Sequence, residues 1–120
     1  MVERINLDTL KNLVDGNVKE DVTCVIKFYS SRCGYCDNLK PVYETLSEQY
    51  GDKVYFFAIN VDDPVDETPP VTVNGVPTIC MIKIDNEVKV TMLDEPDEPH
   101  PVTWYWLEYM KDFVDRGLYR

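Results

Sequence analysis

The sequence predicts an α/β protein built on a central mixed β-sheet with helices on both of its faces. Short apolar, β-branched runs typical of buried strands alternate in the first part of the chain with segments whose apolar residues recur at helical spacing. Two adjacent strand-like runs follow, and a helix-like segment comes last. Strands separated by helices favour parallel neighbours and adjacent strands favour an antiparallel hairpin, so this order predicts a mixed sheet.

The composition is that of one globular domain covering residues 1–120. Hydrophobic residues make up 44% of the chain, enough for a sizeable core. The formal net charge of −10 argues against nucleic acid or an anionic membrane as a partner. No apolar run approaches the roughly 20 residues that span a bilayer, and the chain does not open on a secretory leader pattern. If the chain is the full gene product, we expect a cytoplasmic protein; its oligomeric state stays open, with a monomer expected.

The first elements follow from local patterns. Residues 2–7 alternate apolar and polar side chains, which predicts a half-buried strand. Asp8 resembles the N-cap of a short helix that Gly16 closes. Residues 22–29 are apolar on both faces except at Lys27, so we expect this strand at the centre of the sheet.

The middle of the chain predicts a long helix and another strand. Apolar residues recur at helical spacing from Gly34 to about Tyr50, and Gly51 ends the helix. Pro41 falls inside this helix, where it removes a backbone hydrogen bond and should cause a kink. Residues 54–59 form a second buried, strand-like run.

The last third predicts a hairpin and a helix. Residues 62–70 are too rich in proline for more than a turn of helix. Strand patterns return at 77–84 and 87–93, joined by Asp85-Asn86, residue types that suit a tight hairpin turn. The last helix should carry a row of large apolar side chains on one face: Trp106, Tyr109, Met110 and Phe113.

A cysteine pair marks the start of the long helix. Cys33-Gly34-Tyr35-Cys36 follows the central strand, so the first sulfur lies at a helix N-terminus, where free N–H groups and the helix dipole favour a thiolate. The thiolate is the form of cysteine that attacks disulfides, and this spacing in such a setting predicts redox chemistry. A zinc site normally needs a second cysteine pair or added histidines, whereas the single histidine, His100, lies in a proline-rich loop. We therefore expect no metal.

The motifs resemble those of the thioredoxin superfamily, and the local sequence of each motif is similar to that of protein disulfide isomerase catalytic domains. The resemblance spans residues 22–90 and rests on these segments, in family order: Phe28-Tyr29, Cys33-Gly34-Tyr35-Cys36, Asn38-Leu39-Lys40-Pro41-Val42-Tyr43-Glu44, Asn60-Val61-Asp62 and Gly75-Val76-Pro77-Thr78. It implies a thioredoxin fold and thiol–disulfide exchange.

The resemblance also implies the role of each site residue. Cys33 would be the exposed nucleophile and Cys36 the buried resolving thiol, and the two would form the redox-active disulfide. Pro77 would follow a cis peptide bond that faces the cysteines, although it also suits an ordinary strand start. The backbone of Val76 would pair with a substrate peptide beside Gly34-Tyr35. No metal or organic cofactor is implied; the partners would be protein disulfide substrates and a redox donor or acceptor protein that the sequence does not name.

Two positions near the cysteines depart from the family pattern. Lys27 stands where most relatives have a buried carboxylate thought to shuttle a proton to the resolving thiol, and Arg32 replaces a usual tryptophan. Either the Lys27 ammonium reaches an edge with only its stem buried, or it lies under the disulfide with a pKa lowered by desolvation. In the second case it accepts the Cys36 proton as an amine or stabilises the Cys36 thiolate as an ammonium. Arg32 is either a solvated loop residue or a source of positive potential beside Cys33.

Positive charge near either sulfur stabilises the reduced, thiolate-bearing form. The two departures therefore predict a reduction potential above the roughly −270 mV typical of thioredoxin. Tyr35 is a third departure, which makes the motif similar to that of bacterial disulfide isomerases.

Several alternatives stay open at this point. A glutaredoxin-like enzyme would normally show a glycine pair after the Pro77 strand, and none is present there. A thioredoxin-fold binding or structural module with little turnover remains a different class of function. Cys24 and Cys80 are either inert core residues, or a cross-strand bridge or regulatory thiol. The acidic segment 94–98 is either a solvated loop or a surface that favours basic substrates.

Overall fold

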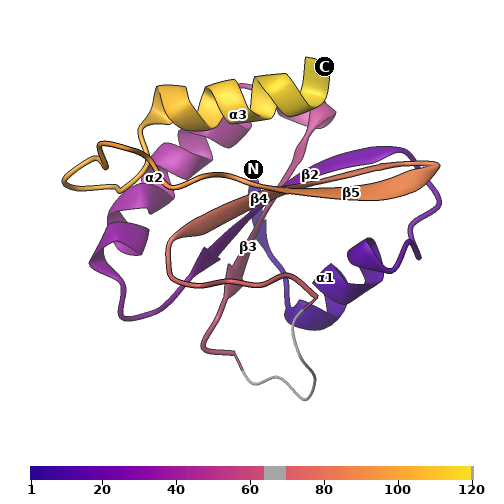
Figure 1. Ribbon diagram of the computed structural model, residues 1–120, viewed down its shortest axis with the longest axis horizontal. Coiled ribbons are helices and arrows are strands. Elements are labelled where there is room, and N and C mark those ends of the chain that lie inside the picture. The colour runs from indigo at the N-terminus through magenta and orange to yellow at the C-terminus, as the bar shows by residue number, and fades with distance from the viewer. Residues whose placement is uncertain (64–69, 120) are drawn as a thin grey trace.

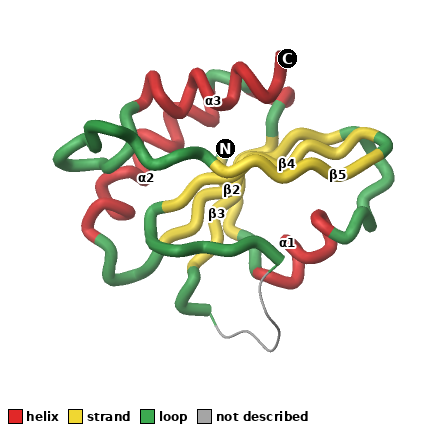
Figure 2. Tube along the Cα trace, in the orientation of Figure 1, coloured by secondary structure: helices red, strands yellow, loops and turns green. Residues whose placement is uncertain are grey.

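The computed structural model describes residues 1–63 and 70–119 and contains a five-stranded mixed sheet (Figures 1 and 2). The strands lie in the order β1 (Val2–Arg4), β3 (Tyr55–Asn60), β2 (Val22–Tyr29), β4 (Thr78–Asp85) and β5 (Glu87–Met92). The first three are parallel, and β4 runs antiparallel to both β2 and β5. The predicted mixed sheet with a central strand over 22–29 is thus confirmed.

Helices cover both faces of the sheet, as expected. Figure 1 shows α2 (Gly34–Glu48) and α3 (Leu107–Tyr119) on one face and α1 (Leu7–Val14) on the other. The core accordingly forms two layers separated by the sheet. Val25 of β2 packs in the layer under α2 and α3, whereas its neighbours Cys24 and Ile26 pack in the layer under α1. This alternation explains why β2 is apolar on both faces.

The N-terminal strand and helix differ in detail from the prediction. β1 ends at Arg4, and Asn6, rather than Asp8, caps α1: its Oδ1 accepts a hydrogen bond from the Thr9 N–H at 2.9 Å. Asn and Asp cap helices about equally well, so the residue types alone do not choose between the two positions. Gly16 closes the helix as expected, with φ of 76° and its N–H 3.3 Å from the Leu13 carbonyl oxygen.

The hairpin and the last helix also refine the prediction. Asp85 pairs directly with Glu87, and Asn86 between them has φ of 53°. Helix α3 begins at Leu107, so Trp106 precedes it and is 44% exposed, contrary to its expected place on the buried face. The aromatic buried in this stretch is Tyr105.

Two further observations bear on the remaining expectations. A short 3-10 turn (Gly51–Lys53) follows α2, and Gly51 has φ of 56°. Within the described residues, no helix has the length and apolar character needed to cross a membrane. Most of the predicted proline-rich connector, residues 64–69, lies outside the described residues.

Candidate active site

The cysteine pair lies at the first turn of α2. Cys33 is the N-cap of this helix, and its Sγ accepts a hydrogen bond from the Cys36 N–H at 3.1 Å. The two residues form a disulfide. Cys33 is partly exposed, whereas Cys36 is only 3% exposed. An external sulfur therefore meets Cys33 first.

The loop before Cys33 is held by the end of β3. Asp62 Oδ2 accepts hydrogen bonds from Ser30 Oγ at 2.8 Å and from the Ser31 N–H at 3.2 Å. Asn60 Nδ2 donates to Ser31 Oγ at 2.9 Å. Sequence reasoning placed Asn60 and Asp62 in a family-like segment without giving them a role. Their polar side chains directly after a buried strand were the available signal.

The segment that enters β4 lies at the same edge of the sheet. Because β2 and β4 are antiparallel and Phe28 pairs with Thr78, the chain enters β4 where β2 leaves for Cys33. The Val76–Pro77 peptide bond is cis, as the resemblance implied. A pocket of about 460 Å³ is lined by Ser30 from the cysteine loop together with Val76. The fold thus brings Val76-Pro77 next to the loop that carries Cys33.

Lys27 is buried on the α2 side of the sheet. The residue is 4% exposed, and its Nζ lies 4.9 Å from the centre of the Tyr43 ring and 5.5 Å from that of Tyr29. It lines a pocket of about 360 Å³ together with Cys36 and Lys40. Burial, and secondarily the charge of Lys40, lowers the pKa of Lys27 to about 8. The ammonium is therefore placed over aromatic rings instead of at an exposed edge.

The three other predicted site residues near the motif are exposed. Arg32 makes no side-chain hydrogen bond or ion pair within the described residues. A Cβ added to Gly34 would meet no atom within 4 Å, so the space above this residue is open. Tyr35 is 40% exposed. All three are accessible to a partner.

A loop from the far end of the chain reaches the motif, which sequence reasoning missed. The Tyr35 ring makes an edge contact with Trp104, at 5.4 Å between centroids, and Trp104 Nε1 donates to Glu95 at 2.8 Å. Asn38 on α2 donates through Nδ2 to the Val102 carbonyl oxygen at 3.0 Å. The acidic segment is therefore docked beside the cysteine pair. His100 takes part in this loop, because its Nδ1 accepts hydrogen bonds from two backbone N–H groups.

The other two cysteines are free and buried. Cys24 pairs with Ile82 and Cys80 with Ile26, so the two thiols are diagonal neighbours on β2 and β4. Burial raises the pKa of Cys24 to about 11 and that of Cys80 to about 12. High pKa values and burial agree with the inert-core interpretation.

Comparisons with known proteins agree with this geometry. A family model described as Thioredoxin matches residues 5–98. A thioredoxin of Borreliella burgdorferi is 32% identical over 82 residues, covering 68% of this chain and 70% of that protein. The chloroplastic M-type thioredoxin of Brassica napus is 33% identical over 92 residues, which cover 77% of this chain but only 50% of that protein.

Solved structures share the fold. The Trx4 domain of ERdj5 superposes with a TM-score of 0.74 at 13% identity, covering 98% of this chain and 96% of that one. Because the family model matches most of the chain and the Cys33–Cys36 disulfide lies at the start of α2, the chain belongs to the thioredoxin family and is an oxidoreductase of that family.

Proposed function

We propose that this protein exchanges disulfides with protein substrates through Cys33 and Cys36. The observation that carries the proposal is the unequal placement of the two sulfurs. Cys33 is partly exposed at the N-terminus of α2, and its disulfide partner Cys36 is buried behind it. An exposed nucleophile and a buried resolving thiol are the arrangement that two-step exchange requires.

The reaction starts from the reduced pair. The Cys33 thiolate attacks one sulfur of a substrate disulfide, the substrate S–S bond breaks, and its other sulfur leaves as a thiolate that takes up a proton. Cys36 then loses its proton and attacks Cys33 Sγ, which releases the second substrate sulfur and forms the Cys33–Cys36 disulfide. Two electrons pass from the dithiol to the substrate, and the reverse sequence oxidises a dithiol.

Local groups favour the thiolate of Cys33. The Cys36 N–H that donates to Cys33 Sγ at 3.1 Å in the disulfide is placed to donate to a thiolate as well. Arg32, exposed and adjacent in sequence, adds positive potential that salt screens. A substrate strand would pair with the Val76 backbone and cross the open space over Gly34 beside Tyr35.

Lys27 acts on the second step. It lines the same pocket as Cys36, and its pKa of about 8 leaves it mostly an ammonium at pH 7. In that form it stabilises the Cys36 thiolate; above pH 8 it becomes an amine that accepts the Cys36 proton. Only the second action corresponds to the proton transfer attributed to the carboxylate usual in relatives.

The function is tested by reduction of insulin disulfides in the presence of dithiothreitol. We expect the wild type to accelerate insulin reduction and Cys33→Ser to abolish the acceleration. Cys36→Ser should accumulate a mixed disulfide on Cys33, visible by mass spectrometry, because the resolving step is lost. A wild-type rate equal to that of Cys33→Ser would instead indicate a binding module. A glutathione-coupled assay separates the glutaredoxin-like alternative.

The electrostatic role is tested by the reduction potential. Equilibration with a glutathione buffer at pH 7 should give a potential above roughly −270 mV. Lys27→Met should lower it by an amount on the order of 30 mV, because the reduced form loses a stabilising charge. Lys19→Gln is the control and should leave the potential unchanged, because this exposed lysine precedes the start of β2 whereas the motif follows the end of that strand. Equal potentials for wild type and Lys27→Met would remove Lys27 from the mechanism.

The direction of net reaction depends on this potential and on a second redox protein that restores the pair. A low potential suits a reductase, and a high one suits an oxidase or isomerase.

A further inference from the structure

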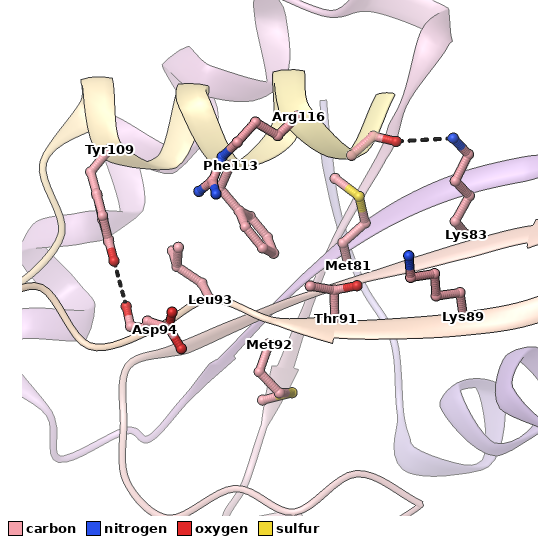
Figure 3. A pocket seen from close by; sticks show the side chains of 11 residues that line it. Met81, Lys83, Lys89, Thr91, Met92, Leu93, Asp94, Tyr109, Phe113 and Arg116 are labelled. Atoms are coloured by element: carbon pink, nitrogen blue, oxygen red, sulfur yellow. Dashed lines mark hydrogen bonds between the residues drawn. The ribbon is translucent and has the colours of Figure 1, made fainter. Parts of the chain in front are cut away.

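A second pocket lies between the β4–β5 hairpin and α3 (Figure 3). Its volume is about 420 Å³, and none of its described lining residues belongs to the cysteine motif. The floor is apolar, formed by the buried side chains of Met81, Leu93 and Phe113. Pockets of about 300–1,000 Å³ with such a floor are those that hold small organic ligands.

Three cationic side chains line this pocket in a protein whose net charge is −10. Lys83 and Lys89 are direct partners in the β4–β5 register, so both rise from the same face of the hairpin. Figure 3 shows them beside each other, whereas the Arg116 guanidinium extends along α3 toward Phe113. Like charges at directly opposite positions of a hairpin destabilise it.

The two lysines form no ion pair in the described part of the chain. Lys83 Nζ donates to the Gly117 carbonyl oxygen at 3.0 Å, and Lys89 has no side-chain partner in the described part of the chain. Neither lysine has a carboxylate within ion-pair distance among residues 1–63 and 70–119. Arg116 Nε lies 2.9 Å from Asp112, which leaves its outer nitrogens unpaired by that contact. A bound anion would relieve the repulsion between the lysines.

The two ends of the pocket carry opposite charges. The lysines stand at one end, the apolar floor lies in the middle, and Asp94 stands at the other end beside Tyr109, whose hydroxyl donates to the Asp94 carbonyl oxygen at 3.0 Å. An anionic group is attracted to the lysine end and repelled from the Asp94 end. A single orientation is therefore favoured for any ligand that has one charged end.

We propose that this pocket binds a small organic anion with an apolar body. The anionic head lies between Lys83 and Lys89, and the body covers the floor formed by Met81 and Phe113. The proposal is independent of the cysteine chemistry, so Cys33→Ser should bind such a ligand as the wild type does.

The test uses decanoate as the probe and the four methionines of the chain as reporters. The Met81 side chain lies on the pocket floor, whereas the Met92 side chain points to the opposite face of β5 and Met1 does not line the pocket. In protein labelled with ¹³C at the methionine methyl groups, decanoate below its micelle-forming concentration should shift the Met81 signal in a saturable way. The Met1 signal should stay in place, and decyltrimethylammonium, with the same chain and opposite charge, should produce no saturable shift.

Charge variants separate specific binding from adsorption. Lys83→Gln with Lys89→Gln should weaken decanoate binding at least about tenfold, because the charge-assisted contacts are lost. Lys89→Gln alone should weaken it by about threefold and keeps the Lys83 contact to α3, so a loss of folding cannot account for the result. Lys19→Gln is the matched control and should bind as the wild type. Equal shifts with the cationic probe, or an affinity unchanged in both pocket variants, would overturn the proposal.

Discussion

The Lys27 side chain is buried, and burying its positive charge lowers the stability of the folded protein. Its Nζ contacts two aromatic rings and has no carboxylate within ion-pair distance in the described residues. Desolvation disfavours the ammonium in the folded state, which is why the pKa falls from 10.5 to about 8. Cation–π contacts offset only part of this penalty.

This penalty predicts a pH-dependent stability. Between about pH 8 and 10.5 the unfolded chain still holds the Lys27 proton that the folded protein has lost, so stability rises with pH across this window. The gain attributable to Lys27 is on the order of 3 kcal/mol. Lys27→Met should therefore be more stable than the wild type at pH 7. This difference in the free energy of unfolding should disappear by pH 10.5, as measured by urea unfolding.

The comparison must be a difference between the two proteins, because other groups titrate in the same range. Cys24 and Cys80 have raised pKa values, so their contribution to stability falls as pH rises. These contributions cancel when Lys27→Met is subtracted from the wild type. A stability difference that does not change with pH would contradict the assigned pKa of Lys27.

At the scale of single elements, α2 is tied to the sheet by one buried hydroxyl. Tyr43 is fully buried, and its hydroxyl lies 3.1 Å from the Val25 carbonyl oxygen and 2.8 Å from that of Phe57. One side chain thus joins α2 to the two neighbouring central strands. These contacts fix the position of α2, the helix that carries the cysteine pair, relative to β2.

Removing this hydroxyl should weaken the protein measurably. We expect Tyr43→Phe to reduce the free energy of unfolding by about 1–2 kcal/mol, because a buried hydrogen bond is lost and two carbonyl groups lose a partner. Tyr55→Phe is the matched control: Tyr55 is 54% exposed and its hydroxyl has no hydrogen bond in the described residues, so its loss should be near zero. Equal stability of both variants would show that the Tyr43 contacts contribute nothing.

The elements also show where sequence patterns suffice. Residues 22–29 were predicted and found as β2, because a double-faced apolar run bounded by polar residues has one stable solution. The cysteine pair and the cis bond before Pro77 were placed by motifs that are local in sequence. The contact of Trp104 with Tyr35 was not predicted, because it joins distant residues and depends on a backbone with φ of 68° that no local pattern indicates.

For the whole molecule, the dominant electrostatic property is the net charge of −10. The docked acidic loop puts some of this charge beside Tyr35 through Glu95 and Trp104. A field of this sign attracts cationic partners and repels anionic ones over a distance set by ionic strength.

Exchange rates should therefore depend on substrate charge and salt. We expect a disulfide peptide flanked by lysines to react with reduced protein at least about threefold faster at low than at high NaCl, because electrostatic steering is screened. The same peptide flanked by glutamates should show the opposite trend, and a neutral one should be nearly insensitive. Stopped-flow measurement of the second-order rates checks this; parallel salt dependence of the three peptides would show that the field does not steer association.

The rate at which the two core thiols react with a thiol reagent reports how often this part of the core opens. Cys24 and Cys80 flank the same ladder between β2 and β4, and both are free while Cys33 and Cys36 are joined. Both side chains lie in the core layer under α1, so in the oxidised protein a thiol reagent can reach a sulfur only when α1 leaves the sheet, the strands part or the whole domain unfolds. The labelling rate in native buffer thus measures how often the core around Cys24 and Cys80 opens to solvent, and no added label is needed.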